Sequence, residues 1–242
     1  MHDSSFGRLL GVLVAPGKTF RSIAERPTWL APLLVLLVLG TTAAYMMQQR
    51  VDQEELVRHQ VSQFGMGNVS DDQIQEMVER NEKMGPVTLL VGPIMTAVVF
   101  LIVALVFWVA FKMVGSEMDF KSSLATSVHG LMPSAISLLL SILILLGRST
   151  VTPEEAMSGG ILTSSAATVA PEEASPVVKS LLGSLDVFSI WSLILLVIGY
   201  RVVAKVSPKA AAITVIALWL LYVLGKAGFA AAIGSMAGGA GS

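Results

Sequence analysis

Residues able to do catalytic or metal chemistry are scarce in this 242-residue chain, which has no cysteine and three histidines. His2, His59 and His129 are not spaced as metal ligands, and no His-Glu-x-x-His sequence occurs. The glycine-rich patterns that hold phosphates or dinucleotides and the Gly-x-Ser-x-Gly pattern of hydrolases are also absent. The sequence therefore predicts no catalytic residue, no metal site and no cofactor, and the protein is not expected to be an enzyme.

Asp186 and Lys226 are charged residues at or inside apolar segments, where charge is costly and is usually kept for function. Asp186 precedes one apolar segment, and Lys226 lies late in the last one. Because both are expected near the same membrane face, we predict an ion pair or a water-lined contact between them. The alternative is that each side chain reaches the membrane surface independently.

A further apolar segment, 124–146, carries a histidine, a proline and a row of small residues. His129 is predicted to be a hydrogen-bonded packing residue, with a proton relay as the alternative, and Pro133 is predicted to kink the helix. The small residues repeat every three or four positions, which lets helix backbones approach closely in lipid. A polar substrate groove is the alternative use of this face. Its members are Ser127, Gly130, Ser134, Ser137 and Ser141.

The elements that position these residues are long apolar helices. The chain is 54% apolar and 14% charged with a mean hydropathy of +0.73, whereas a soluble domain carries about 25% charged residues. This composition excludes a soluble enzyme domain, a disordered chain and a coiled coil, and a net charge of −1 excludes a basic nucleic-acid binder. Since a spanning helix needs about 20 apolar residues, we predict an all-α polytopic membrane protein. The membrane domain, 29–242, has five predicted spans at 29–47, 87–111, 124–146, 187–203 and 210–233, with outer loops 50–86 and 147–183.

Lysine and arginine placement predicts the orientation of these spans. Basic residues outnumber acidic ones before the first span and between spans four and five, whereas residues 50–86 hold four basic and eight acidic residues. We therefore expect a cytoplasmic N-terminus and an external C-terminus, with a bacterial inner membrane as the default location. The first apolar segment is too long for a signal peptide and is predicted to be an uncleaved anchor.

Residues 1–28 are predicted to form a cytoplasmic amphipathic segment of two short helices separated at Pro16. Such helices suit the headgroup layer of the membrane, and a docking surface for a cytosolic partner is the alternative. The apolar positions are Phe6, Leu9, Leu10 and Leu13 in the first helix and Phe20, Ile23 and Ala24 in the second.

Residues 50–86 are predicted to form two outer helices that cap the membrane domain. Ser70 and Gln73 form a capping-box pattern at the start of the second helix. Gly85-Pro86 is expected to end that helix before the second span begins.

The order of these parts resembles the YIP family, the Ypt/Rab-interacting membrane proteins, in its bacterial branch. The resemblance begins in the segment 13–32, continues at 119–121 and 129–133, and is most specific at 185–191. The residues that carry it most clearly are Pro16, Thr19, Phe20, Asp186, Phe188, Trp191 and Gly199. The resemblance implies five spans with a cytoplasmic N-terminus. Because the chain lacks the Asp-Leu-Tyr-Gly-Pro motif of the eukaryotic branch, Rab binding is not carried over.

Two functions follow as hypotheses. The first is a non-enzymatic scaffold or accessory protein of the inner membrane, whose small-residue face and fourth and fifth spans bind other membrane proteins or a second copy. Some bacterial members of the family resemble accessory subunits of ABC-type exporters, which makes an exporter the candidate partner. The second is a small transporter or lipid-handling protein with a polar cavity around the third span. Its lining would include Ser134, Ser137, Ser141, His129, Asp186 or Lys226.

Overall fold

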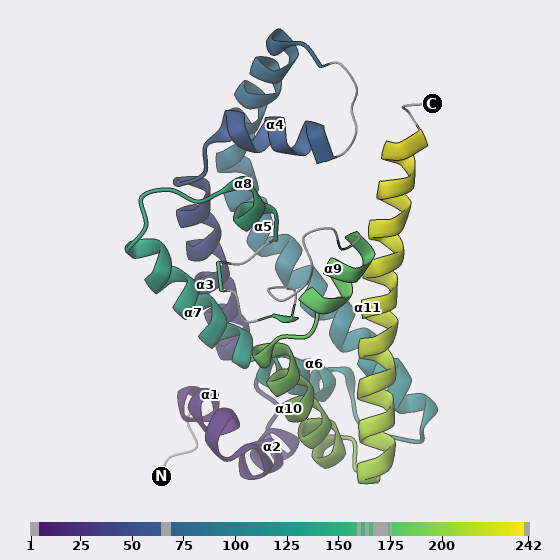
Figure 1. Ribbon diagram of the computed structural model, residues 1–242. Coiled ribbons are helices and arrows are strands. Elements are labelled where there is room, and N and C mark those ends of the chain that lie inside the picture. The colour runs from purple at the N-terminus through teal and green to yellow at the C-terminus, as the bar shows by residue number, and fades with distance from the viewer. Residues whose placement is uncertain are drawn as a thin grey trace. The chain divides into compact units, whose positions relative to one another are not determined.

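A computed structural model of the chain describes residues 5–63, 69–158, 161–162, 165–166, 174 and 176–239 (Figure 1). The named elements within these residues are all helices. In chain order they are α1 (Ser5–Val14), α2 (Pro16–Glu25), α3 (Leu30–Gln48), α4 (Gln53–Gln63), α5 (Asp71–Met113), α6 (Phe120–Gly130), α7 (Pro133–Leu146), α8 (Pro153–Ser158), α9 (Pro176–Gly183), α10 (Val187–Val203) and α11 (Pro208–Gly239).

Four helical segments among the described residues are long and apolar enough to cross a membrane. They are Leu30–Gln48, Asp71–Met113, Phe120–Leu146 and Pro208–Phe229, which match the first, second, third and fifth predicted spans. The predicted fourth span coincides with α10, whose 17 residues rise about 26 Å, near the lower limit for a membrane crossing. The protein is therefore an all-α polytopic membrane protein, and the crossing by α10 stays a prediction.

The predicted helix end at Gly85-Pro86 is wrong, because α5 continues through both residues to Met113. A proline inside a helix removes one backbone hydrogen bond and costs about 3 kcal/mol. The residues that follow are almost all apolar, and in lipid such a segment must satisfy its backbone groups within a helix. The need to keep these apolar residues helical in lipid outweighs the local cost at Pro86. The predicted outer helix and the second predicted span are therefore one helix.

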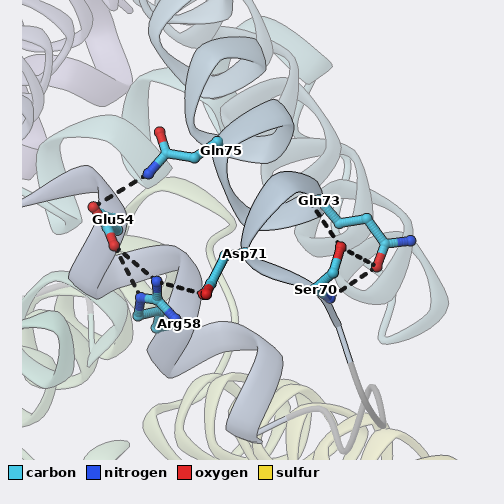
Figure 2. A network of polar contacts seen from close by, with 6 residues as sticks. All are labelled: Glu54, Arg58, Ser70, Asp71, Gln73 and Gln75. Atoms are coloured by element: carbon cyan, nitrogen blue, oxygen red, sulfur yellow. Dashed lines mark hydrogen bonds and ion pairs between the residues drawn. The ribbon is translucent and has the colours of Figure 1, made fainter.

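The capping box predicted at the start of α5 is confirmed (Figure 2). The Ser70 amide donates to Gln73 Oε1 at 3.0 Å, and the Gln73 amide donates to Ser70 Oγ at 3.3 Å. Beside it, Arg58 of α4 bonds both Glu54 and Asp71, each at 2.9 Å. The hydrogen bond to Asp71 raises the pKa of Arg58 above its usual value, although exposed ion pairs of this kind stabilise a fold only slightly.

The predicted third span consists of two helices, α6 and α7, separated by Leu131 and Met132. Pro133 is the first residue of α7, a position where its missing N–H leaves no helical bond unmade. The amides of Ser134 and Ala135 donate to the carbonyls of Leu131 and Met132, three residues earlier, at 3.0 and 2.9 Å. This tight turn keeps the backbone hydrogen-bonded through the interruption.

The chain divides into two compact units. The first unit comprises residues 1–40, 93–138 and 186–222, and the second comprises residues 41–92, 139–185 and 223–242. The main core of the first unit gathers apolar side chains from the N-terminal helices, the C-terminal half of α5, α6, α10 and α11. Its fully buried members include Val12, Phe20, Phe111, Tyr200 and Val215.

The short N-terminal helices belong to this core. Helix α2 packs on α10 and on α6 (Figure 1). Phe20 and Ile23 of this helix are fully buried. In α1, Leu9 is buried, whereas Phe6 and Leu10 are 73% and 71% exposed. The apolar face of α2 is therefore covered by protein, while α1 keeps an exposed apolar edge that suits the predicted interfacial location.

In the second unit, polar bonds fasten the segment after α7 to the end of α3. The Val151 amide donates to the Arg50 carbonyl at 2.9 Å, and Arg50 Nε donates to the Arg148 carbonyl at 3.0 Å. Arg148 also bonds Glu155 of α8 at 2.5 Å, which lowers the pKa of that carboxyl below its usual value. Met46, Leu145 and Val151 form the small apolar core beneath these bonds.

Candidate functional site

A group of buried polar side chains in the first unit is centred on Tyr200 of α10. Its side chain is fully buried, and its hydroxyl lies 2.9 Å from Ser123 Oγ and 2.7 Å from Ser127 Oγ. The same hydroxyl donates to the Ser123 carbonyl at 3.2 Å, and Ser123 Oγ donates to the Ala104 carbonyl at 2.8 Å. These hydrogen bonds join α5, α6 and α10 at one point.

Two phenylalanines of α5 stack on the same tyrosine. The ring of Phe111 lies 4.5 Å from that of Tyr200 with 12° between the planes, and the ring of Phe107 lies 4.7 Å away at 24°. We call these five residues, Phe107, Phe111, Ser123, Ser127 and Tyr200, the Tyr200 cluster. Sequence reasoning missed Tyr200, although a tyrosine three residues before the end of an apolar segment is a usable signal, because a buried tyrosine hydroxyl usually finds a hydrogen-bond partner.

Two glycines let neighbouring side chains approach closely. A Cβ atom on Gly130 would lie 2.5 Å from Leu196 Cδ2 and 2.9 Å from Leu196 Cγ, so α6 and α10 are nearly in backbone contact there. A Cβ atom on Gly199 would lie 2.7 Å from Phe20 Cε1 and 2.9 Å from Thr126 Cγ2. Gly199 is therefore where α2, α6 and α10 meet.

Several residues of the family-like motif lie around this meeting point. Pro16 is the first residue of α2, and Thr19 Oγ1 donates to the Ala15 carbonyl at 3.1 Å. Phe20 contacts Gly199, while Trp191 is partly buried against the same core. Among the described residues, Pro16 therefore starts α2, and Phe20 packs this helix on α10.

The residues of the small-residue face have different neighbours in the structure. Ser127 bonds Tyr200, and Gly130 contacts Leu196, so both are occupied within the chain. Ser134 lines a pocket that also contains residues of α5, α10 and α11. Ser137 and Ser141 of α7 are half-buried. The first two positions of the face are therefore not available to another protein.

His129 is fully buried in the core of the first unit. Its Nδ1 lies 2.8 Å from the Ala125 carbonyl, one turn earlier in α6. The other ring nitrogen, Nε2, has no hydrogen-bond partner among the described residues. The buried setting agrees with a packing role for His129, which stays a prediction. Among the described residues, no hydrogen-bond partner expected of a proton relay contacts its ring.

Asp186 and Lys226 each have a defined partner. Asp186 caps α10, where its carboxylate accepts from the amides of Phe188 and Ser189 at 2.9 and 3.1 Å and from the Ser189 hydroxyl. Lys226 Nζ donates to Ser184 Oγ at 3.3 Å. The ion pair between Asp186 and Lys226 stays a prediction, and the cap is a role of Asp186 that sequence reasoning did not foresee.

A double-mutant cycle separates the cap from the pair. We expect Asp186→Ala to lower the free energy of unfolding by about 0.5–2 kcal/mol, because the amides at the start of α10 lose their acceptor. Asp186→Asn keeps an acceptor and removes the charge, so it is expected to cost less. Denaturant unfolding of Asp186→Asn, Lys226→Met and the double variant then measures the pair, and strictly additive losses would rule it out.

The described residues of the first unit include eight exposed basic side chains, most of them on helices. Asp119 caps α6, and hydrogen bonds from Ser122 lower the pKa of its carboxyl. Trp108 Nε1 donates to the Met118 carbonyl at 3.1 Å, which holds the same loop against α5. The exposed basic residues of the first unit are Lys18, Arg21, Arg26, Lys112, Lys121, Arg201, Lys205 and Lys209.

This chain matches a known relative and a family model. A relative from Bacillus subtilis (strain 168), "Membrane protein YknW", is 28% identical over 230 residues, which cover 95% of this chain and 92% of the relative. No solved structure matches the chain significantly. The Yip1 domain matches residues 10–229, a range that runs from α1 through the Tyr200 cluster into α11. The chain therefore belongs to the Yip1 family, as its resemblance in sequence implied.

Proposed function

We propose that this Yip1-family protein is a non-enzymatic scaffold or accessory protein of a bacterial inner membrane, which binds other membrane proteins. An ABC-type exporter is the first candidate partner. The observation that carries the proposal is that buried polar side chains hydrogen-bond within the protein. Tyr200 bonds the hydroxyls of Ser123 and Ser127, and Tyr200 and Ser123 also donate to backbone carbonyls of α6 and α5. These groups therefore hold helices together.

The surface left for a partner is apolar. Leu34 of α3, Leu101 of α5 and Leu220 of α11 are 48%, 42% and 47% exposed, respectively. In lipid, two helices associate through side-chain packing between such surfaces rather than through the hydrophobic effect. We therefore place the partner on the exposed faces of the long helices, and Ser127 and Gly130 serve contacts within the chain.

The alternative of a small transporter or lipid-handling protein with a polar cavity has less support. Of the residues expected to line that cavity, Ser134 lies at the pocket described above, and the pocket is otherwise mostly apolar. His129 lies in the packed core instead. A polar substrate would find few hydrogen-bonding groups in this pocket.

Affinity purification in a mild detergent tests the proposal. We expect subunits of an ABC-type exporter to co-elute with the full-length protein at a fixed ratio that survives a second purification step. An unrelated tagged membrane protein, purified in parallel in the same detergent, is the control for nonspecific capture. A protein that elutes without any membrane partner would contradict the proposal.

The proposed orientation places the N-terminus in the cytoplasm and the C-terminus outside. The eight exposed basic residues of the first unit support it, because cytoplasmic loops are rich in lysine and arginine. The chain has no cysteine, so single cysteines report accessibility without background. In intact spheroplasts, a membrane-impermeant maleimide should label Glu76→Cys at once and Lys205→Cys only after permeabilisation. The reverse pattern would overturn the orientation.

A further inference from the structure

The first unit contains a pocket of about 520 Å³ between α5, α10 and α11, a size within the usual range of about 300–1,000 Å³ for small-molecule sites. Fifteen residues line it, of which three are serines and most of the others are aliphatic or aromatic. The lining residues Val99, Ile102, Leu221 and Tyr222 are between 53% and 67% exposed on helices that can span a membrane. The pocket therefore opens toward the apolar part of the bilayer.

Ser192 of α10 provides a second, independent observation. This lining residue is 4% exposed, and its hydroxyl has no hydrogen-bond partner among the described residues. A buried hydroxyl without a partner is unfavourable in an apolar setting. The neighbouring Ser189 also lines the pocket, but its hydroxyl already donates to Asp186. Ser192 is thus left with a free donor next to an apolar pocket.

The volume of the pocket decides which kind of molecule can enter it. A helix about 10 Å across that rises about 1.5 Å per residue occupies roughly 120 Å³ per residue, so the pocket has room for roughly four residues of a helix. The pocket therefore has too little volume to enclose a helix of a second protein. Water is unfavourable beside so many apolar side chains. A hydrocarbon chain with one acceptor oxygen matches both the volume and the chemistry of the lining.

We propose that this pocket binds one acyl chain of a membrane glycerolipid, whose ester carbonyl accepts a hydrogen bond from the Ser192 hydroxyl. Asp186, Ser189 and Ser192 lie at successive three-residue steps along α10, which gives the polar glycerol region a path from the start of the helix to the pocket. The bound lipid fills space that the side chains of the first unit leave open. This role is independent of the partner proteins proposed above.

Photolabelling of the full-length protein in nanodiscs tests the site. The probe is a phosphatidylcholine with an acyl-chain diazirine, and mass spectrometry of peptides locates the adducts. We expect adducts to concentrate on lining residues of α5, α10 and α11. Ile102→Trp, which fills the pocket, should reduce them at least fivefold, while Leu101→Trp, an exposed neighbour outside the lining, should leave them unchanged. Equal labelling of these two variants, or labelling spread evenly over all spans, would overturn the site.

A second comparison tests the hydrogen bond. Ser192→Ala should weaken labelling about fivefold, the effect of losing one neutral hydrogen bond. An ether-linked analogue, which lacks the ester carbonyl, should label the wild type as weakly as the ester lipid labels Ser192→Ala. If ether and ester lipids label the wild type equally, the assignment of Ser192 as the donor to the ester is wrong.

Discussion

Replacing Tyr200 with alanine is expected to lower the free energy of unfolding by about 3–5 kcal/mol, the usual cost of removing a large buried aromatic side chain. The ring is fully buried and stacks on Phe107 and Phe111, so its removal leaves a cavity at the centre of the first unit. It also leaves Ser127 Oγ without its hydrogen bond to α10. Denaturant unfolding of the detergent-solubilised protein, followed by tryptophan fluorescence, measures the loss.

Tyr200→Phe separates the ring from the hydroxyl. This variant keeps both stacking contacts and removes the hydrogen bonds to Ser123 and Ser127, so we expect a loss of about 1–3 kcal/mol. If alanine costs no more than phenylalanine, the stack contributes nothing. If phenylalanine costs nothing, the hydroxyl does not hold α6 to α10 in the way described.

Gly199→Leu is the second substitution with a large expected effect. A Cβ atom at this position would already lie within 2.9 Å of Phe20 and Thr126, and a leucine adds three further carbons. Because overpacking a buried site costs about 1–3 kcal/mol and occasionally more, we expect about 3 kcal/mol and separation of α2 from α10. Limited proteolysis between α2 and α3 should then become faster than in the wild type.

The matched control is Gly225→Leu in α11, where an added Cβ atom meets nothing within 4 Å. Both variants gain the same helix propensity, so the difference between their unfolding free energies isolates the contact. Equal stabilities for the two variants would show that α2 does not pack closely on Gly199 in the folded protein.

Much of the fold was predictable because it depends on local patterns. Apolar length identified four segments that the structure gives as helices long and apolar enough to cross a membrane, and the Ser70 and Gln73 pattern identified a real helix start. The end assigned at Gly85-Pro86 failed for a physical reason. Proline is a local signal, but the apolar segment after it must remain helical in lipid, and the larger requirement prevailed.

The candidate site was less predictable because it depends on contacts between distant residues. Periodicity identified the apolar face of α2, but it does not say whether lipid or protein covers that face, and Phe20 is covered by protein. The small-residue pattern found Ser127 and Gly130, yet their partners, Tyr200 and Leu196, lie about 70 residues away. Asp186 was noticed for its charge, whereas its observed contacts are those of a helix cap.

Photo-crosslinking in living cells tests the central claim, binding of other membrane proteins, most directly. A photoreactive residue is placed singly at Leu34, Leu101 or Leu220, which are exposed on three different helices. We expect at least one position to yield a discrete adduct with a subunit of an ABC-type exporter, and the Asp72 position, in the polar N-terminal part of α5, to yield none. Protein adducts absent from all three helices, with lipid adducts alone, would contradict it.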